Sequence, residues 1–241
     1  MIMKILTLGD IHGRTCWEDI IKIENPDIVV FLGDYVSTHE GISGTSQISN
    51  LINILNYKKN NPNKVILLRG NHDIQHCGFT WAACSGLYLD VQQWMMDNID
   101  EFLRLTQWVY LYDNIIFSHA GISKTWYNNS GFTSIESINN YEPDCKFGFT
   151  PDSFLDYTGT SETQPLTWIR PESLLYCAID GFTHVVGHTP VRRICNIAEL
   201  FKNEANTNPA QNISDIWCCD NLPNEYLIIE DGVFIVKQYN N

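Results

Sequence analysis

Residues 8–13 read Leu8-Gly9-Asp10-Ile11-His12-Gly13, and they place an aspartate and a histidine two positions apart where an apolar run stops at glycine. The run before them, residues 3–8, is mostly aliphatic and is predicted to form a buried strand. Carboxylate and imidazole are ligands that divalent metals accept, and the end of a strand holds them rigidly. By itself an Asp-x-His pattern is more often a solvated turn, so its meaning depends on the rest of the chain.

Four later strands are predicted to end in the same way. Apolar runs cover residues 27–32, 64–68, 114–117 and 183–186, and each is followed within three residues by polar side chains. Those side chains are Asp34, Asn71, His72, His119 and His188. Because the carboxyl ends of strands in an open α/β sheet form the edge where sites lie, we expect these residues to meet Asp10 and His12.

The remaining segments predict helices and then a run of closely spaced strands. Helices are expected at residues 17–25, at 45–60 with Thr45 or Ser46 as the N-cap, and over most of 79–105. Strands are expected at 215–220, 226–229 and 233–237, the last two joined by a hairpin turn at residues 230–232. A strand-and-helix first half followed by a meander of these strands predicts an α/β fold with two mixed sheets face to face, flanked by helices.

A single domain is expected to span residues 1–241. Residues 124–164 show no clear period and are rich in Asn, Ser, Thr, Gly and aromatic side chains. They are predicted to form a loop-rich insertion, either ordered over the site or a mobile lid. Residues 202–214 are polar and are predicted to form a surface loop.

Composition argues against several classes of protein. The chain has 28 acidic and 15 basic residues and a formal net charge of -13, so generic nucleic-acid binding is not expected. No apolar run reaches the length of a membrane span, and the N-terminus leads into a strand without a secretory leader. The eight cysteines lack C-x-x-C spacing and are expected to be buried thiols. We therefore expect a cytoplasmic protein that does not bind membranes.

Five motifs follow one another between residues 9 and 190. They are Gly9-Asp10-Ile11-His12-Gly13, Gly33-Asp34-Tyr35, Gly70-Asn71-His72-Asp73, Ser118-His119-Ala120-Gly121 and Gly187-His188-Thr189. Together they resemble the signatures of the calcineurin-like metallophosphoesterases, and most closely the branch of the bacterial and phage Ser/Thr protein phosphatases (PPP-type) and the diadenosine tetraphosphatases. The resemblance implies a four-layer αββα sandwich and a metal-dependent hydrolase.

The resemblance also implies roles for individual residues. Two divalent metal ions are implied, one held by Asp10, His12 and Asp34 and the other by Asp34, Asn71, His119 and His188, with Asp34 as the bridge. Manganese is the expected metal, with iron, zinc or nickel as alternatives. His72 is the candidate catalytic general acid, which would protonate the leaving oxygen after a metal-activated hydroxide attacks the phosphate.

The second motif departs from the pattern of that branch, which continues with an aspartate and an arginine. Ser37 and Thr38 stand at those positions, so the aspartate that orients the general acid and the arginine that grips phosphate are both missing. We expect Ser37, Asp73 or His76 to steady His72 instead.

Other cationic side chains are then needed to bind phosphate. Arg14 and Arg170 are the candidate phosphate-binding residues, because a guanidinium presents paired donors to a tetrahedral dianion. The other histidines, His39, His76 and His184, are expected at surface or strand-end positions, and Arg69 is expected to have a structural role.

Three functions stay open on the sequence. The leading hypothesis is hydrolysis of phosphate monoesters, with a Ser/Thr protein phosphatase as one form of it. The second is a nucleotide pyrophosphatase or phosphodiesterase of the diadenosine tetraphosphatase type, with residues 124–164 as the substrate wall. The third is a non-catalytic metal-binding interaction protein, against which the complete set of ligand positions weighs. The expected partner is a phosphorylated protein or small molecule, and the oligomeric state is left open.

Overall fold

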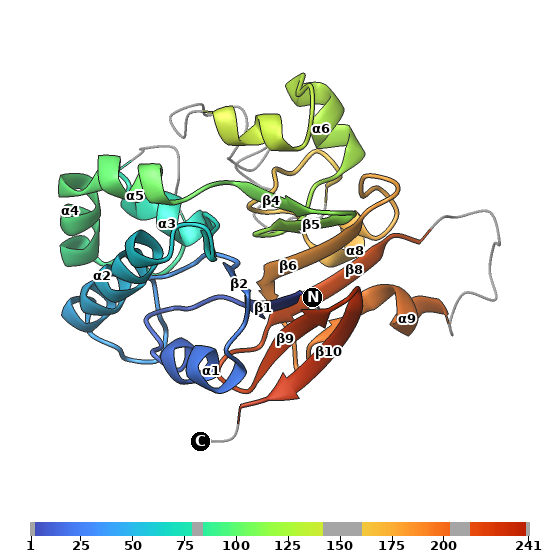
Figure 1. Cartoon of the computed structure of the whole chain (residues 1–241). Helices are drawn as coiled ribbons and strands as arrows, with labels where there is room; N and C mark the ends of the chain where they lie inside the picture. Colours follow the sequence, from blue (N-terminus) through green and yellow to red (C-terminus); the bar gives the residue numbers. More distant parts are fainter. Residues whose placement is uncertain (1–2, 79–83, 142–160, 203–212, 240–241) are drawn as a thin grey trace.

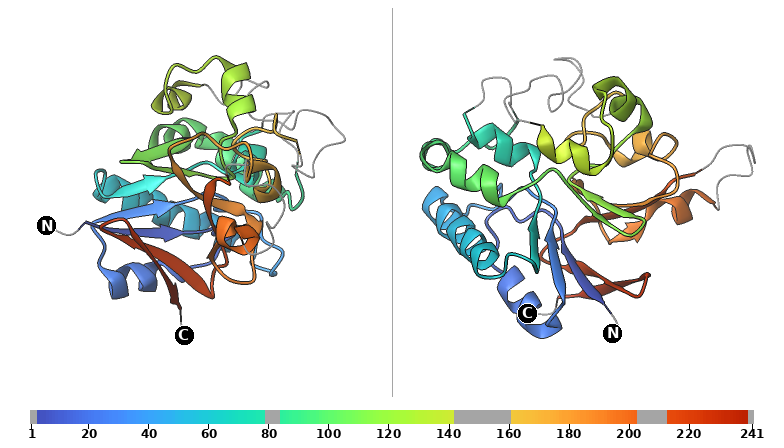
Figure 2. Two further views of the ribbon diagram at one scale, coloured as in Figure 1. Left: turned by 90° about the vertical axis from the view of Figure 1, so that its right-hand side faces the viewer. Right: turned by 45° about the horizontal axis from the view of Figure 1, so that its top comes forward.

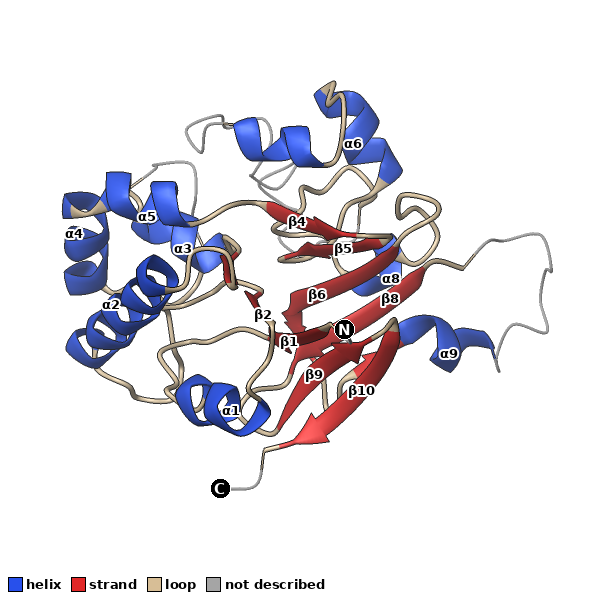
Figure 3. Cartoon of the chain, in the orientation of Figure 1, coloured by secondary structure: helices blue, strands red, loops and turns tan. Residues whose placement is uncertain are grey.

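The computed structural model describes residues 3–78, 84–141, 161–202 and 213–239. Two five-stranded sheets lie face to face at its centre, with helices on both outer sides (Figure 1). Figure 3 shows the same layers by type of element. Most of the residues that line the site lie at the ends of these strands or in the segments that follow them.

The first sheet contains three parallel strands and an antiparallel hairpin. Its parallel strands are β1 (Lys4–Leu8), β2 (Ile28–Phe31) and β3 (Val65–Leu67). The hairpin consists of β9 (Glu225–Glu230) and β10 (Val233–Gln238), and β9 pairs antiparallel with β1. The strand order is β10-β9-β1-β2-β3, so the carboxyl ends of the three parallel strands lie at one edge.

The second sheet also has a parallel centre. The parallel strands are β5 (Ile115–Ser118), β6 (Thr183–Pro190) and β8 (Asp215–Asp220). The antiparallel edge strands are β4 (Val109–Tyr112) and β7 (Cys195–Asn196), and the order is β4-β5-β6-β8-β7. This sheet contributes a second set of strand ends to the same region.

Helices form the two outer layers. The first sheet is covered by α1 (Trp17–Glu24), α2 (Gly44–Asn60), α4 (Leu89–Asp97) and α5 (Ile99–Leu105), and α3 (Asn71–His76) follows β3. The second sheet is covered by α6 (Lys124–Ser130), the 3-10 helix η1 (Glu136–Asn140), α8 (Pro171–Leu174) and α9 (Ile197–Lys202). Figure 2 shows from two further sides that α1 and α6 lie at opposite ends of this stack.

The cores follow from the period of two along each strand. On β1, Ile5 faces the second sheet, whereas Leu6 and Leu8 face the helices. On β2, Val30 faces the second sheet and Phe31 faces the helices. The apolar runs seen in the sequence are therefore strands buried on both faces, and the predicted αββα fold is confirmed.

The C-terminal strands differ from the sequence prediction. β8 pairs with β6 in the second sheet, whereas β9 pairs with β1 in the first, so the three strands do not form a meander. Close spacing along the chain shows only that strands follow one another in sequence. Both faces of β8 are apolar or half-buried, so its residues do not indicate which sheet it joins. The predicted hairpin of β9 and β10 is confirmed.

Several helix boundaries also differ. Ser43 caps α2, because its Oγ accepts a hydrogen bond from the Ser46 N–H at 3.2 Å, and Thr45 and Ser46 lie inside the helix. Residues 84–88 are not helical, and 79–83 lie outside the described residues. The expected insertion at 124–164 contains α6 and η1, and its residues 142–160 lie outside the description, as do 203–212 of the expected surface loop.

Two further features bear on the expectations from composition. Among the described parts of the chain, no helix combines the length and the apolar character needed to cross a bilayer. The seven cysteines that the structure describes are free; four are buried, but Cys16, Cys84 and Cys195 are half-buried.

The end of α1 is tied to three strands by one carboxylate. Glu24 accepts hydrogen bonds from Lys237 Nζ on β10 at 2.9 Å and from the Tyr226 hydroxyl on β9 at 2.7 Å. Lys4 Nζ on β1 lies 2.7 Å from its second oxygen. Burial raises the pKa of Glu24, but these three hydrogen bonds outweigh it and lower the pKa from 4.5 to about 2.

We predict that Glu24→Gln lowers the free energy of unfolding by on the order of 2 kcal/mol at neutral pH. Because the folded-state pKa is depressed, this stabilisation is complete above the unfolded pKa of 4.5 and is lost as the pH falls towards 2. Urea unfolding of both proteins across this range measures it. Glu101→Gln, which removes the exposed pair with Lys59, is the control and should change little. A difference that does not depend on pH would contradict the assignment.

Candidate metal centre

The polar strand ends of both sheets converge on one pocket of about 650 Å³. Asp10, Asp34 and Asn71 follow β1, β2 and β3, whereas His188 lies near the end of β6. The pocket is lined by Asp10, His12, Asp34, Asn71, His72 and His188, together with His39, Cys84, Ser85, Trp168, Arg170, Pro190 and Asp220. His119 follows β5 and is fully buried against Asn71 and Asp34.

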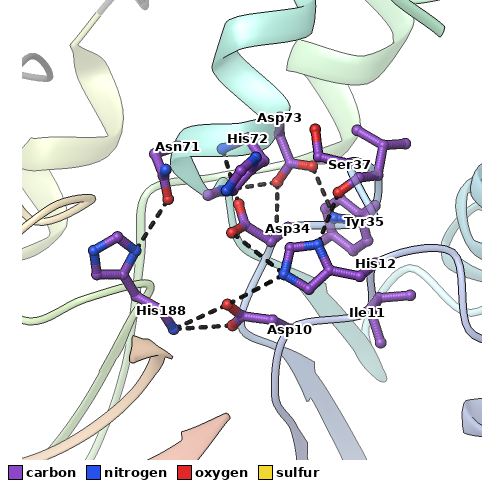
Figure 4. Close-up of polar contacts among 12 residues, drawn as sticks. Asp10, Ile11, His12, Asp34, Tyr35, Ser37, Asn71, His72, Asp73 and His188 are labelled. Atoms are coloured by element: carbon purple, nitrogen blue, oxygen red, sulfur yellow. Dashed lines mark hydrogen bonds and ion pairs between the residues drawn. The ribbon is translucent and has the colours of Figure 1, made fainter. Parts of the chain in front are cut away.

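Asp10, His12 and Asp34 form one group of ligand atoms. Their side chains offer atoms that all lie within 4.8 Å of one another, and Figure 4 shows them turned towards each other. His12 Nε2 lies 3.9 Å from Asp10 Oδ2 and 4.0 Å from Asp34 Oδ2. His12 Nδ1 donates to the carbonyl of Val36 at 3.0 Å, which leaves the Nε2 lone pair for a metal. The group therefore fits a divalent cation.

A second group surrounds the side-chain oxygen of Asn71. Asn71 Oδ1 lies 3.0 Å from His119 Nε2 and 3.1 Å from His188 Nδ1. His119 Nδ1 donates to the carbonyl of Leu32 at 2.8 Å, so Nε2 of the neutral ring is an acceptor. Burial lowers the pKa of His119 to about 3, which keeps the ring neutral. The rings of His119 and His188 therefore bring nitrogen ligand atoms within 3.1 Å of the Asn71 amide oxygen, and this set of oxygen and nitrogen ligand atoms also fits a metal.

Asp34 belongs to both groups. Its Oδ2 atom lies 4.0 Å from His12 Nε2 and 3.5 Å from His119 Nε2. Its other oxygen, Oδ1, accepts the backbone N–H of His72 at 3.0 Å. The bridging role expected of Asp34 stays a prediction, and this geometry is compatible with it.

Glycines allow the carboxylates to lie against the backbone of neighbouring strand ends. A Cβ at Gly70 would lie 2.0 Å from Asp34 Oδ1, and one at Gly187 would lie 2.2 Å from Asp10 Oδ1. Any side chain at either position would displace a carboxylate. The glycines that precede Asn71 and His188 in their motifs therefore leave room for the carboxylates of Asp34 and Asp10, which belong to other motifs.

Three of the candidate ligand residues have backbone conformations that side chains rarely adopt. The φ angles are 46° at His12, 50° at Asp34 and 62° at His188. His188 also lies where the pairing of β6 with β8 shifts register, and its N–H donates to Asp10 Oδ1 at 3.0 Å. Such strain persists where surrounding structure fixes it, and a bulge of this kind redirects a side chain out of the ladder.

Asp73 connects the second and third motifs. Its carboxylate accepts the backbone N–H groups of Asp34 at 2.9 Å, Tyr35 at 2.8 Å and Gly70 at 2.8 Å (Figure 4). Burial raises the pKa of Asp73 to about 7, and these hydrogen bonds act in the opposite direction. Asp73 therefore holds the backbone of Asp34 in place. It does not steady the ring of His72, which differs from the expectation drawn from the sequence.

The two other residues expected to steady His72 also make different contacts. Ser37 Oγ lies 3.5 Å from His76 Nδ1, and that nitrogen donates to the backbone carbonyl of His72 at 2.8 Å rather than to its ring. The ring nitrogen His72 Nδ1 instead lies 3.5 Å from the Cys84 Sγ. Burial, with His12 and His119 adding to it, lowers the pKa of His72 to about 3.

The two candidate arginines occupy different environments. Arg170 lines the pocket, and its Nη1 donates to the His188 carbonyl at 3.0 Å and to Thr189 Oγ1 at 3.1 Å. Arg14 forms a two-pronged ion pair with Glu40, with Nη2 at 2.6 Å and Nε at 3.1 Å. Its Nη1 donates to the Asp10 carbonyl at 3.1 Å. Arg170 is therefore the better placed of the two for phosphate.

Sequence reasoning missed Asp220. It ends β8 and lines the pocket, and burial raises its pKa to about 6 although Arg14 and Arg170 lower it. The signal was present, because residues 215–220 form an apolar strand ending in aspartate, as at Asp10.

The remaining histidines and Arg69 can now be placed. His39 is exposed but lines the pocket. His76 is fully buried at the end of α3, so the surface or strand-end position expected for it is wrong. His184 is also fully buried, but it lies near the start of β6, which agrees with a strand-end position. Arg69 donates to Thr106 Oγ1 at 2.9 Å and to the Leu103 carbonyl at 2.7 Å, which agrees with a structural role.

We predict that Asp73→Asn weakens metal binding about 10- to 100-fold, because an amide cannot accept three N–H groups with both of its polar atoms. Titration of the metal-stripped protein with Mn²⁺, followed by calorimetry, measures the change. The control is Asp231→Asn, in the exposed hairpin turn between β9 and β10. Unchanged affinity in a folded Asp73→Asn protein would show that the backbone of Asp34 does not depend on this carboxylate.

Comparison with solved structures supports the same fold. The cold-active protein-tyrosine phosphatase of a psychrophilic Shewanella species superposes with a TM-score of 0.63 and 17% identity, over 99% of this chain and 78% of its own. A metallophosphoesterase from Sphaerobacter thermophilus gives 0.58 and 15%, over 100% and 89%. A protein serine/threonine phosphatase from Saccharomyces cerevisiae gives 0.57 and 14%, over 99% and 80%. At these identities the likeness shows a shared fold.

The sequence itself matches a family model. No curated protein matches the chain. The model of the calcineurin-like phosphoesterases matches residues 3–198, which include all five motifs. The chain therefore belongs to the calcineurin-like phosphoesterases, a family of metal-dependent hydrolases.

Proposed function

We propose that this protein is a metal-dependent phosphatase that hydrolyses phosphate monoesters, with a phosphorylated protein or small molecule as its substrate. The observation that carries the proposal is the position of Asp34 Oδ2, which lies between His12 Nε2 and His119 Nε2 at 4.0 and 3.5 Å. One carboxylate atom thus faces two groups of nitrogen and oxygen ligands beside a pocket large enough for a phosphorylated side chain.

Two divalent metal ions are the inferred cofactors. Asp10, His12 and Asp34 would hold one, and Asp34, Asn71, His119 and His188 the other. This mixture of oxygen and imidazole nitrogen suits manganese, with iron, zinc and nickel as alternatives. When bound, such metals lower the pKa of water and neutralise phosphoryl oxygens.

The chain's own residues supply the other requirements. Arg170 would bind phosphate oxygens through Nε and Nη2, which make no hydrogen bond with the residues described by the structure, while Nη1 stays anchored to His188 and Thr189. His72 would give a proton to the leaving oxygen from a ring that faces the same pocket.

Domain organisation and location are inferred from the same features. Site residues come from both sheets and from positions 10 to 188, which supports a single domain over residues 1–241. The free cysteines support a cytoplasmic location, where thiols stay reduced.

A substrate panel tests the function. We predict that the metal-stripped protein, titrated with Mn²⁺, turns over phosphomonoesters faster than phosphodiesters or dinucleoside polyphosphates. Phosphopeptides come first in the panel, because two of the similar structures are named protein phosphatases. Faster cleavage of a dinucleoside polyphosphate or a diester would select the second enzyme class. Two bound metals without turnover of any substrate would indicate an interaction protein.

Asp34→Asn should lower monoester turnover by more than about 100-fold, beyond the loss caused by changing a residue that only supports a ligand. It should also reduce the number of metal ions bound per chain, measured by elemental analysis. Asp231→Asn is again the matched control. Full metal content in an Asp34→Asn protein would contradict the bridging role.

Arg170→Ala should lower kcat/KM for monoesters about 10- to 100-fold, because hydrogen bonds to a charged group contribute about 1.5–3 kcal/mol each. Arg14→Ala should have a smaller effect, since its guanidinium is held by Glu40. The exposed Arg192→Ala is the control. Steady-state kinetics of the three variants measure kcat/KM. A larger loss in Arg14→Ala than in Arg170→Ala would assign phosphate binding to Arg14 instead.

A further inference from the structure

We propose that Glu40 is an internal competitor of the substrate, because its carboxylate occupies the edge of Arg14 that would otherwise bind a phosphate group. The proposal deepens the function proposed above and rests on it. Glu40 directly follows His39, and Arg14 lies two residues after His12. His12 and His39 both line the pocket, so the ion pair between Arg14 and Glu40 lies beside it. Burial raises the pKa of Asp220, another residue of the pocket, and the charge of Arg14 acts against this shift.

The guanidinium of Arg14 is held in place by the first motif. Its Nη1 donates to the carbonyl of Asp10 at 3.1 Å, and the side chain is 16% exposed. Its Nε and Nη2 donate to the two oxygens of Glu40 at 3.1 and 2.6 Å. These N–H groups are parallel donors that fit either a carboxylate or a phosphate. Because Nη1 anchors the guanidinium, the same edge would face an incoming phosphate once Glu40 had moved.

The side chain of Glu40 is held more loosely than that of Arg14. It is 51% exposed, and among the described residues Arg14 donates all the hydrogen bonds that its carboxylate accepts. A Cβ at the next residue, Gly41, would meet no atom within 4 Å, so there is open space beside it. The backbone is anchored, because the buried Thr38 accepts the Glu40 N–H at 3.0 Å and its own carbonyl accepts the Tyr88 hydroxyl at 2.9 Å. The carboxylate can therefore turn into solvent without movement of the backbone.

The strength of the ion pair determines how strongly Glu40 competes. An exposed ion pair of good geometry changes an equilibrium by at most a factor of about five. A phosphate dianion carries a greater charge than a carboxylate and can therefore displace it. The apparent affinity for phosphate is lowered by the fraction of molecules in which Arg14 is occupied. Glu40 therefore weakens phosphate binding by about fivefold without preventing it, and the same competition accounts for the small effect expected of Arg14→Ala.

The test measures binding of inorganic phosphate to the Mn²⁺-loaded protein by calorimetry. We expect Glu40→Ala to lower the Kd for phosphate about fivefold, because Arg14 is then free. The double variant Glu40→Ala/Arg14→Ala should bind phosphate as Arg14→Ala alone does, because the competitor has no effect without its target. Glu101→Ala is the matched control, since it also removes a partly exposed carboxylate, one that pairs with Lys59 at 2.9 Å. It should leave the Kd nearly unchanged.

Steady-state kinetics provide a second measurement. With a phosphoserine peptide as substrate, Glu40→Ala should lower KM by the same factor and change kcat little, because the contact with Arg14 is made in the ground state and the transition state alike. A substitution that only disturbed the structure would lower kcat or raise KM. The opposite direction of the KM change therefore distinguishes competition from structural damage.

The outcomes separate this proposal from the proposed function. An unchanged Kd in Glu40→Ala would overturn the competition, and so would an equal gain in Glu101→Ala, which would reflect net charge alone. A gain that persists in the double variant would show that Glu40 does not act through Arg14. A wild-type protein that hydrolyses no phosphate ester would overturn the proposed function, and the phosphate titration would still report whether Glu40 competes for Arg14.

Discussion

Four carboxyl groups lie buried at the same end of the interface between the sheets, and the rest of the site is arranged around them. They belong to Asp10, Asp34, Asp73 and Asp220, and burial raises the pKa of each. Backbone N–H groups partly compensate: Asp10 accepts from His188, Asp34 from His72, and Asp73 from three residues. A bound cation would offset the remaining cost of burying these carboxylates. The carboxyl groups that destabilise the metal-free fold are therefore the ones that favour cation binding.

This arrangement also requires strained backbone conformations. Left-handed conformations at His12, Asp34 and His188 each cost on the order of 1–3 kcal/mol, and they persist because the surrounding structure fixes them. The apolar layer between the sheets, which includes Val30, Leu32 and Val185 next to the site, provides that rigidity. The packing of the core therefore supports the geometry of the site, because the strands that are buried on both faces end in the strained turns that carry the site residues.

The sequence predicted the features that depend on local pattern. Apolar runs ending in glycine or serine and a polar residue were enough to bring Asp10, Asp34, Asn71, His119 and His188 together, because strand direction fixes where strand ends lie. It did not show which sheet β8 joins, since that depends on pairing between distant segments. The sequence pattern also could not predict the contact of Cys84 with His72 or the pairing of Arg14 with Glu40. Each of these depends on how a loop folds back onto the site.

The contact between the His188 N–H and Asp10 Oδ1 joins residues 178 positions apart in the chain. Contacts of such large sequence separation form late, because nearly the whole chain must be closed into a loop before they contribute stability. A chain still emerging from the ribosome, with β6 not yet made, would present Asp10, His12 and Asp34 without the histidine that completes the centre. The group around Asn71 would thus be completed only when β6 has joined, whereas Asp10, His12 and Asp34 all come from the part of the chain that is made first.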